Sequence, residues 1–206
     1  MPETLPLKAT LAGGQRVEIR AIRPADKDEL RRAFERLSPE SRLSRFLSPK
    51  SRLDDEQLRF LTEVDGKDHV AIVAVTDSPD LKSEYGLGVA RFIRMPPGDV
   101  AEGAVTVVDA MQNRGLGTLL LRVLAGLAHD RGIRAFRAEV LADNTRIRNL
   151  LDAAGGHVVE DHGDTLVFEI PLEPVPDETE RDRQHPLRRV LRAAAETIAA
   201  LRPPER

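Results

Sequence analysis

The segment DAMQNRGLGTLLLRVLAGLAHDRG, residues 109–132, constrains the fold more than any other part of the chain. It follows a strand-like apolar run and continues as a helix-like one, with Gly115 and Gly117 at the junction. After a strand, the backbone N–H groups of a glycine-rich turn can point into one concavity, and the next helix adds its positive end. Arg114 adds charge there, and Thr118 adds a hydroxyl. The segment therefore predicts an anion site, suited to a phosphate or pyrophosphate.

Other nucleotide-binding loops fit these glycines less well. A Walker loop requires a lysine directly after its last glycine, and no lysine follows either glycine here. A dinucleotide-binding turn requires a third glycine where this chain has Leu120. A plain turn without a ligand is the alternative for 115–117. The second Gly-x-Gly, at Gly86 and Gly88, runs into a strand and is interpreted as structural.

Apolar periodicity predicts the elements around this loop. Strand-like patterns occur at 16–23, 69–76, 85–93, 102–109 and 134–142. Helix-like patterns occur at 26–37, 38–46, 53–61, after the loop glycines, and at 144–154. Residues 157–170 predict a hairpin that turns at 162–164. A meander followed by strand–helix–strand crossings predicts an α/β fold, with helices on both faces of a mixed sheet.

Composition divides the chain into three parts. Residues 1–14 are expected to be irregular, 15–172 to form the folded domain, and 173–206 to form a charged linker and an amphipathic helix. The apolar stripe of that helix comprises Leu187, Val190, Leu191, Ala194, Ile198 and Leu201. A lone helix of this length is marginal in water, so the stripe is expected to pack on something. The alternatives for the surface that it packs on are its own domain, a second copy in a homodimer, and a different protein.

Composition also excludes several classes of function. The chain has no cysteine, which rules out thiolate nucleophiles and cysteine zinc sites. The five histidines show no metal-binding spacing, so no metal is expected, and His69 is expected to cap or pack a strand. A net charge of −3 argues against nucleic-acid binding through a basic field. Without a signal peptide or a bilayer-spanning run, a cytoplasmic protein with no membrane partner is expected.

These motifs resemble a known family. QNRGLGT at 112–118, between a strand and an amphipathic helix, is similar to the acyl-CoA pyrophosphate loop of the GNAT superfamily of N-acetyltransferases, Q/R-x-x-G-x-G/A. Asn144, at the head of the next helix, resembles the following motif of the family. The segments at 22–49, 60–75 and 88–93 further resemble the catalytic domain of bacterial protein lysine acetyltransferases. The resemblance covers about residues 15–172.

The resemblance implies a GNAT-like fold that transfers an acetyl group from acetyl-CoA to an amine, with a protein lysine as the expected acceptor. Acetyl-CoA is the expected cosubstrate. The residues implied to bind it are Val105, Thr106, Val107, Gln112, Asn113, Arg114, Gly115, Leu116, Gly117, Thr118 and Asn144. Among these, the strand residues 105–107 would offer a backbone N–H to the thioester oxygen, where charge develops during transfer.

Two carboxylates are candidates for the general base that the amine requires. Glu102 in AEGAV matches the base of the protein lysine acetyltransferases, and Glu139 in RAEVLADN matches that of the ribosomal-protein N-terminal acetyltransferases. A solvated strand glutamate is the alternative for each. Leu151 stands where many members carry a tyrosine that protonates the leaving thiolate. Two further functions stay open: a small-molecule amine acetyltransferase, and a non-catalytic acyl-CoA sensor with the same fold.

Overall fold

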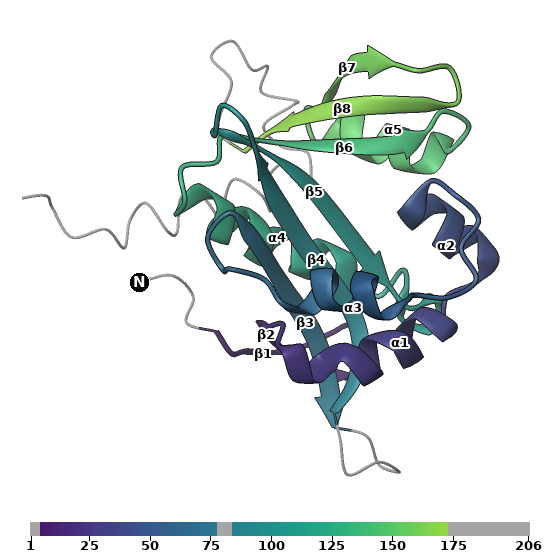
Figure 1. Cartoon of the computed structure of the whole chain (residues 1–206), viewed down its shortest axis with the longest axis vertical. Coiled ribbons are helices and arrows are strands. Elements are labelled where there is room, and N and C mark those ends of the chain that lie inside the picture. Colours follow the sequence, from purple (N-terminus) through teal and green to yellow (C-terminus); the bar gives the residue numbers. More distant parts are fainter. Residues whose placement is uncertain (1–4, 78–83, 173–206) are drawn as a thin grey trace, which may run out of the picture. The chain divides into compact units, whose positions relative to one another are not determined.

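The protein is described by a computed structural model that covers residues 5–77 and 84–172 (Figure 1). The chain divides into two compact units. The N-terminal unit comprises the described residues up to 91 together with 104–121. The C-terminal unit comprises 92–103 and 122–172. Strands β4 (Glu84–Met95) and β5 (Val100–Val107) and helix α4 (Leu116–His129) each contribute to both units.

In the N-terminal unit the strand order is β1-β2-β3-β4-β5. Strands β1 (Leu7–Thr10), β2 (Arg16–Ala21) and β3 (His69–Asp77) pair antiparallel in succession. The expectation of an irregular segment at 1–14 is therefore wrong for β1. This edge strand is short and buries none of its side chains fully, so it carries too weak an apolar alternation to be recognised.

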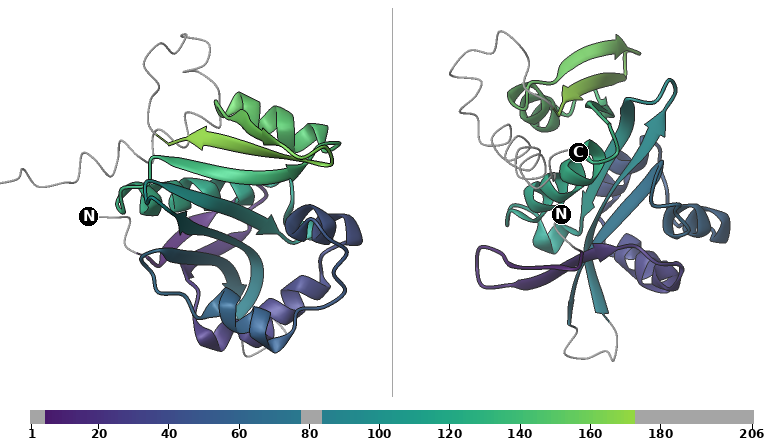
Figure 2. Two further views of the ribbon diagram at one scale, coloured as in Figure 1. Left: turned by 45° about the horizontal axis from the view of Figure 1, so that its top comes forward. Right: turned by 90° about the vertical axis from the view of Figure 1, so that its left-hand side faces the viewer.

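Three helices of this unit lie on one face of its strands: α1 (Lys27–Glu35), α2 (Pro39–Phe46) and α3 (Asp55–Thr62), preceded by the short helix η1 (Pro24–Asp26) (Figure 2). Ser38 and Asp54 accept hydrogen bonds from the third residue of α2 and α3, as N-caps do. The helices and the segment before α3 bury one apolar cluster: Phe34, Leu37, Leu53, Leu58 and Leu61.

Gly88 on β4 has little space around its Cα. Leu120, in the first turns of α4, lies 3.0 Å from where a Cβ on Gly88 would be. That Cβ would also meet the Thr106 carbonyl oxygen at 2.9 Å, which confirms a structural role for Gly88.

In the C-terminal unit the strand order is β4-β5-β6-β8-β7. Strand β6 (Ala135–Leu141) runs parallel to β5 and antiparallel to β8 (Thr165–Pro171), which pairs with β7 (His157–Asp161). Helix α5 (Thr145–Ala153) follows β6. The hairpin turns at Gly163, whose φ is +82°, as the sequence predicts. Buried side chains of the strands contribute to the core, together with those of α4: Phe92, Ala101, Leu124, Ala128, Phe136, Val140, Leu166, Phe168 and Ile170.

The parallel and antiparallel pairs together make the sheet mixed, so the predicted α/β class with helices on both faces is confirmed. The predicted C-terminal linker and helix at 173–206 lie outside the described residues.

Candidate active site

The loop that the glycines predict joins β5 to α4 within the N-terminal unit. A short helix, η2 (Asp109–Met111), precedes it. Asn113 and Gly115 both have left-handed backbones, with φ of 59° and 84°. Asparagine and glycine are the residues that adopt this conformation at least cost. Left-handed residues that alternate with right-handed ones turn successive N–H groups toward one side and form an anion-binding concavity.

The first turn of α4 adds amide donors to this concavity. Leu119 is the first helical donor, and its N–H bonds to the Gly115 carbonyl at 3.0 Å. The amides of Leu116, Gly117 and Thr118 precede it, so they have no acceptor within the helix. They point out of the positive end of the helix, where an anion is stabilised.

The fold itself does not require glycine at 117. A Cβ on Gly117 would lie 3.7 Å from Val107 Cγ2, an ordinary van der Waals contact. A Cβ on Gly115 would meet nothing within 4 Å, so that position is constrained by its backbone conformation rather than by space. The surface above both glycines is therefore open to a ligand. Arg114 and Thr118 are exposed beside it.

A polar network ties the start of the loop to the N-terminus of α2. The Asp109 carboxylate accepts from the Ser38 backbone N–H (2.6 Å) and the Ser41 hydroxyl (2.6 Å). It also accepts from Gln112 Nε2 (2.9 Å), which donates in addition to the Val107 carbonyl (3.2 Å). The Gln112 side chain therefore anchors the loop from within. The sequence analysis missed Asp109 and Ser41, because a contact across about 70 residues leaves no local pattern.

The network keeps Asp109 ionised. Burial by itself would raise the pKa of this carboxyl, but hydrogen bonds from Ser41 and Ser38 outweigh burial and lower the pKa below its ordinary value. Asp109 is a fixed negative charge held by neutral donors.

The three strand residues of the predicted site differ in where their amides point. Val108 donates its N–H to the Leu87 carbonyl on β4 at 3.0 Å. Residues two apart on a strand face the same neighbour, so Thr106 also directs its N–H toward β4. Val105 and Val107 direct theirs to the opposite edge, where the Val107 carbonyl accepts from Gln112. Val105 and Val107 are the donors that a ligand on that edge could use.

The remaining candidates lie in the C-terminal unit. Glu102 ends the parallel pairing of β5, opposite Arg137, and its side chain is exposed. No hydrogen bond or ion pair from the described part of the chain engages its carboxylate, and Arg137 bonds to Glu169 at 3.0 Å instead. Glu139 lies two residues beyond Arg137 on β6, so it shares the face of Glu102, and it accepts from the Thr165 hydroxyl at 2.6 Å.

Asn144 caps α5. Its Oδ1 accepts from the Ile147 N–H at 3.2 Å, which satisfies one of the first amides of the helix. The head-of-helix position predicted for Asn144 is thus correct.

Three of the histidines that the structure describes have identifiable surroundings. Within 5–77 and 84–172, no three side chains of metal-binding type are grouped to hold an ion. His69 packs on Phe60, with ring centroids 5.0 Å apart, and its Nε2 lies 3.1 Å from Arg91 Nη1. His157 and His162 are exposed on the β7–β8 hairpin.

Comparison with known proteins decides the family. Residues 21–155, well over half of the chain, match the Acetyltransferase (GNAT) family. The chain belongs to this family. As a GNAT acetyltransferase it is an N-acetyltransferase that uses acetyl-CoA as its acyl donor, which confirms the predictions of enzyme class and cosubstrate.

Relatives of this GNAT protein include both short and long chains. It is 31% identical over 146 residues to the acetyltransferase PA5475 of Pseudomonas aeruginosa, covering 71% of this chain and 77% of that protein. It is 30% identical over 201 residues to the acetyltransferase Pat of Mycolicibacterium smegmatis, covering 93% of this chain and 58% of Pat. The chain therefore spans a little over half the length of Pat.

A solved structure supports the same likeness. The GNAT domain of S. lividans PAT matches with a TM-score of 0.72 at 28% identity, over 83% of this chain and 99% of that domain. The resemblance to bacterial protein lysine acetyltransferases is thus confirmed. In the described part of the chain, no helix combines the length and the apolar character needed to cross a bilayer.

Proposed function

We propose that this protein transfers the acetyl group of acetyl-CoA to the side-chain amine of protein lysines, with Glu102 as general base. The likeness to Pat and to the S. lividans PAT domain supports a protein acceptor. The observation that carries the assignment of the base is the exposed carboxylate of Glu102, which no described residue engages.

The loop would bind the donor through backbone groups. Amides of residues 113–118 would surround the pyrophosphate, and Arg114 would add a positive charge at its edge. Gln112 would act from behind the loop, because its amide already bonds to Asp109 and Val107. Asn144 would fix the start of α5, which the resemblance places beside the donor.

The acceptor needs a base because a free lysine is protonated at neutral pH. Its pKa is about 10.4, so removing the proton near pH 7.4 costs about 4 kcal/mol at about 1.36 kcal/mol per pKa unit. An exposed carboxylate can take that proton directly or through one water. Glu102 is ready for this role, whereas Glu139 would first have to release the Thr165 hydroxyl.

Transfer then proceeds by direct attack. The neutral amine nitrogen forms a bond to the thioester carbonyl carbon, and the carbon–sulfur bond breaks with loss of the coenzyme A thiolate. The nitrogen releases its surplus proton to solvent, which leaves a neutral amide. The N–H groups of Val105 and Val107 would stabilise the carbonyl oxygen as it becomes negative. Leu151 offers no proton to the thiolate, and a thiol pKa of about 8.5 makes such an acid dispensable.

A matched pair of variants tests this function. Glu102→Gln is expected to lower kcat by about 10²–10⁴-fold, the usual contribution of a general base, without changing the affinity for acetyl-CoA. Glu139→Gln, an exposed carboxylate on the same sheet face, is the control and should retain most of its activity. Mass spectrometry of a bacterial lysate incubated with isotope-labelled acetyl-CoA would identify the acceptors. Unchanged kcat in Glu102→Gln, or label on small amines without label on lysines, would refute the proposal.

A further inference from the structure

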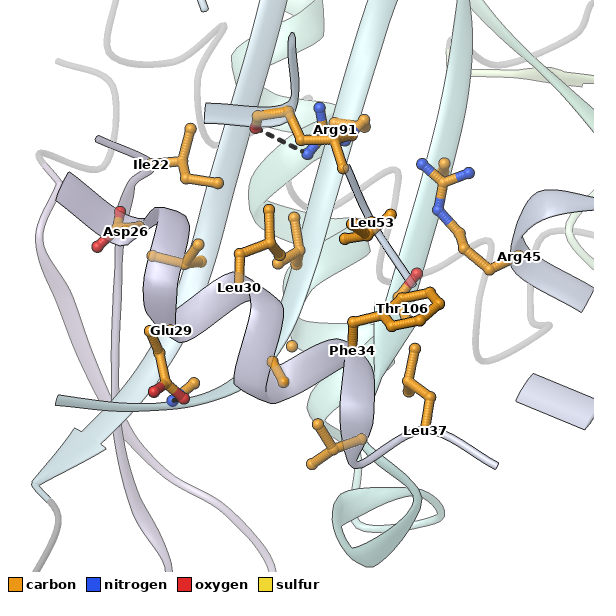
Figure 3. A pocket seen from close by; sticks show the side chains of 18 of the residues that line it. Ile22, Asp26, Glu29, Leu30, Phe34, Leu37, Arg45, Leu53, Arg91 and Thr106 are labelled. Carbon is orange, nitrogen blue, oxygen red and sulfur yellow. Dashed lines mark hydrogen bonds between the residues drawn. The ribbon is translucent and has the colours of Figure 1, made fainter. Parts of the chain in front are cut away.

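A pocket separate from the loop lies within the N-terminal unit, between α1, the segment before α3, and strands β3 to β5 (Figure 3). The cavity has a volume of about 80 Å³ and opens to solvent. Leu30 and Phe34 of α1, Leu53, and Val73 and Val75 of β3 supply apolar walls. A concave, mostly apolar lining with a few polar groups is typical of small-molecule sites.

Arg91 of β4 places a charge in this apolar setting. Its side chain is 4% exposed and lines the pocket. One guanidinium nitrogen donates to the Leu61 carbonyl at 3.0 Å, and another lies 3.1 Å from His69 Nε2. In the described part of the chain, no carboxylate forms an ion pair with Arg91. A buried cation without a counter-ion is costly, so this arrangement calls for an explanation.

The acidic side chains of the pocket do not supply the missing charge. Asp26 and Glu29 line it, but Asp26 bonds to Arg20 at 2.8 Å and Glu29 to Arg36 at 2.8 Å. Arg45 adds a second guanidinium to the lining, and Figure 3 shows it and Arg91 away from the two carboxylates.

Arg91 remains protonated in this setting. Burial, and then the positive charge of Arg45, lower the pKa of Arg91 to about 9, which is still above neutral pH. The pocket therefore keeps the positive charge of Arg91 beside its apolar walls.

We propose that this pocket binds a small aliphatic carboxylic acid, with its carboxylate on Arg91 and its chain along α1 and β3. A guanidinium presents paired N–H groups that match a carboxylate, and the interaction strengthens when water is excluded. The apolar wall stabilises a bound hydrocarbon chain because binding removes apolar surface from water. A cationic or uncharged chain of equal length would leave Arg91 without its partner.

Calorimetry with octanoate tests the proposal on the full chain. Octanoate is expected to bind at least tenfold more tightly than 1-octanol, and octylamine is expected not to bind. The titration is repeated with saturating acetyl-CoA, and binding should persist because the pocket is distinct from the loop. Equal affinity for octanoate and 1-octanol, no heat with octanoate, or displacement by acetyl-CoA would each overturn the proposal.

Two variants locate the site. Arg91→Met keeps the length of the side chain and removes its charge, so it should weaken octanoate binding at least tenfold while leaving 1-octanol unaffected. Ala33→Leu fills the pocket from α1 and should abolish binding of both ligands, and it provides the test if Arg91→Met does not fold. Circular dichroism checks the fold of each variant. Octanoate binding that is unchanged in the folded variants would contradict the assignment.

Discussion

Two arginines of the N-terminal unit have the same small exposure to solvent but different hydrogen-bond partners. Arg20 on β2 and Arg91 on β4 are each 4% exposed. Arg20 bonds to both carboxylate oxygens of Asp26, at 2.8 and 2.9 Å, and to Glu84. Arg91 bonds to a backbone carbonyl and contacts an imidazole. Equal solvent exposure therefore does not mean an equal role: the chain neutralises the charge of Arg20 internally and leaves that of Arg91 facing a pocket.

The electrostatics follow this difference. Hydrogen bonds from Arg20 to Asp26 raise the pKa of Arg20 despite its burial. Burial lowers the pKa of Arg91, and no carboxylate offsets it. A buried arginine that is paired with a carboxylate of its own chain, like Arg20, has a structural role. A buried arginine without such a carboxylate, like Arg91, can pair with the carboxylate of a ligand.

The largest expected effect distinguishes the two arginines by stability. Arg20→Met should lower the free energy of unfolding by about 3–5 kcal/mol, because it leaves the half-buried Asp26 without its cation. Arg91→Met should cost less than about 1–2 kcal/mol, the value of its hydrogen bonds, because it also removes a buried charge and leaves no carboxylate unpaired. Urea denaturation of both variants measures the difference. Equal losses would remove the distinction between a structural and a ligand-binding arginine.

The sequence could not have separated these arginines. Both occur in strand-like apolar runs, EIRAI and VARFI, and their partners come from distant segments. What the sequence does predict is local: the left-handed Gly115 at a strand–helix junction, the Ser38 cap of α2, and the turn at Gly163. Each depends on one residue type that few others can replace.

The local features of the candidate site could likewise be predicted from the sequence, whereas its long-range contacts could not. The loop glycines and Asn144 have backbone roles that motifs encode, and the structure places them at the predicted helix starts. The Asp109–Ser41 contact joins segments 68 residues apart, and the direction of the Val105 and Val107 amides depends on the pairing of β5 with β4. Tertiary contacts of this kind have no periodicity for a sequence pattern to reveal.

A second prediction extends the comparison to a charge that neutral donors hold. Asp109→Asn should destabilise the protein by about 1–2 kcal/mol, because charge-assisted bonds from Ser38, Ser41 and Gln112 are weakened. It should also raise KM for acetyl-CoA several-fold, since the network positions the loop.

The pH dependence of this variant gives the check. The pKa of Asp109 is lowered in the folded state, so its contribution is complete above the ordinary value of 3.8 and is lost as the pH falls through the lower folded value. The urea midpoints of wild type and Asp109→Asn should therefore converge in acid. Ser41→Ala, which removes one donor, is the matched control and should show a smaller loss at neutral pH. A constant difference across this range would mean that the charge of Asp109 does not stabilise the loop.

The smallest expected effect concerns His69, the neighbour of Arg91. Burial, and then the charge of Arg91, lower the pKa of His69, while Asp65 acts in the opposite direction. A depressed histidine pKa means that the contribution of the neutral ring to stability is complete above about pH 6.5 and declines as the pH falls through the folded-state pKa.

His69→Gln keeps an acceptor for Arg91 and cannot titrate, so its stability should vary less than that of the wild type between about pH 7 and 5. The difference should stay below about 1 kcal/mol, because His69 is only partly buried and solvent screens its charge. Octanoate provides a second test. A carboxylate on Arg91 would cancel the repulsion between Arg91 and the protonated His69 ring, raise the pKa of His69, and reduce the stability difference between wild type and His69→Gln further. Nuclear magnetic resonance titration of the His69 ring, with and without octanoate, measures this shift, and a pKa that does not change with octanoate would mean that no carboxylate reaches Arg91.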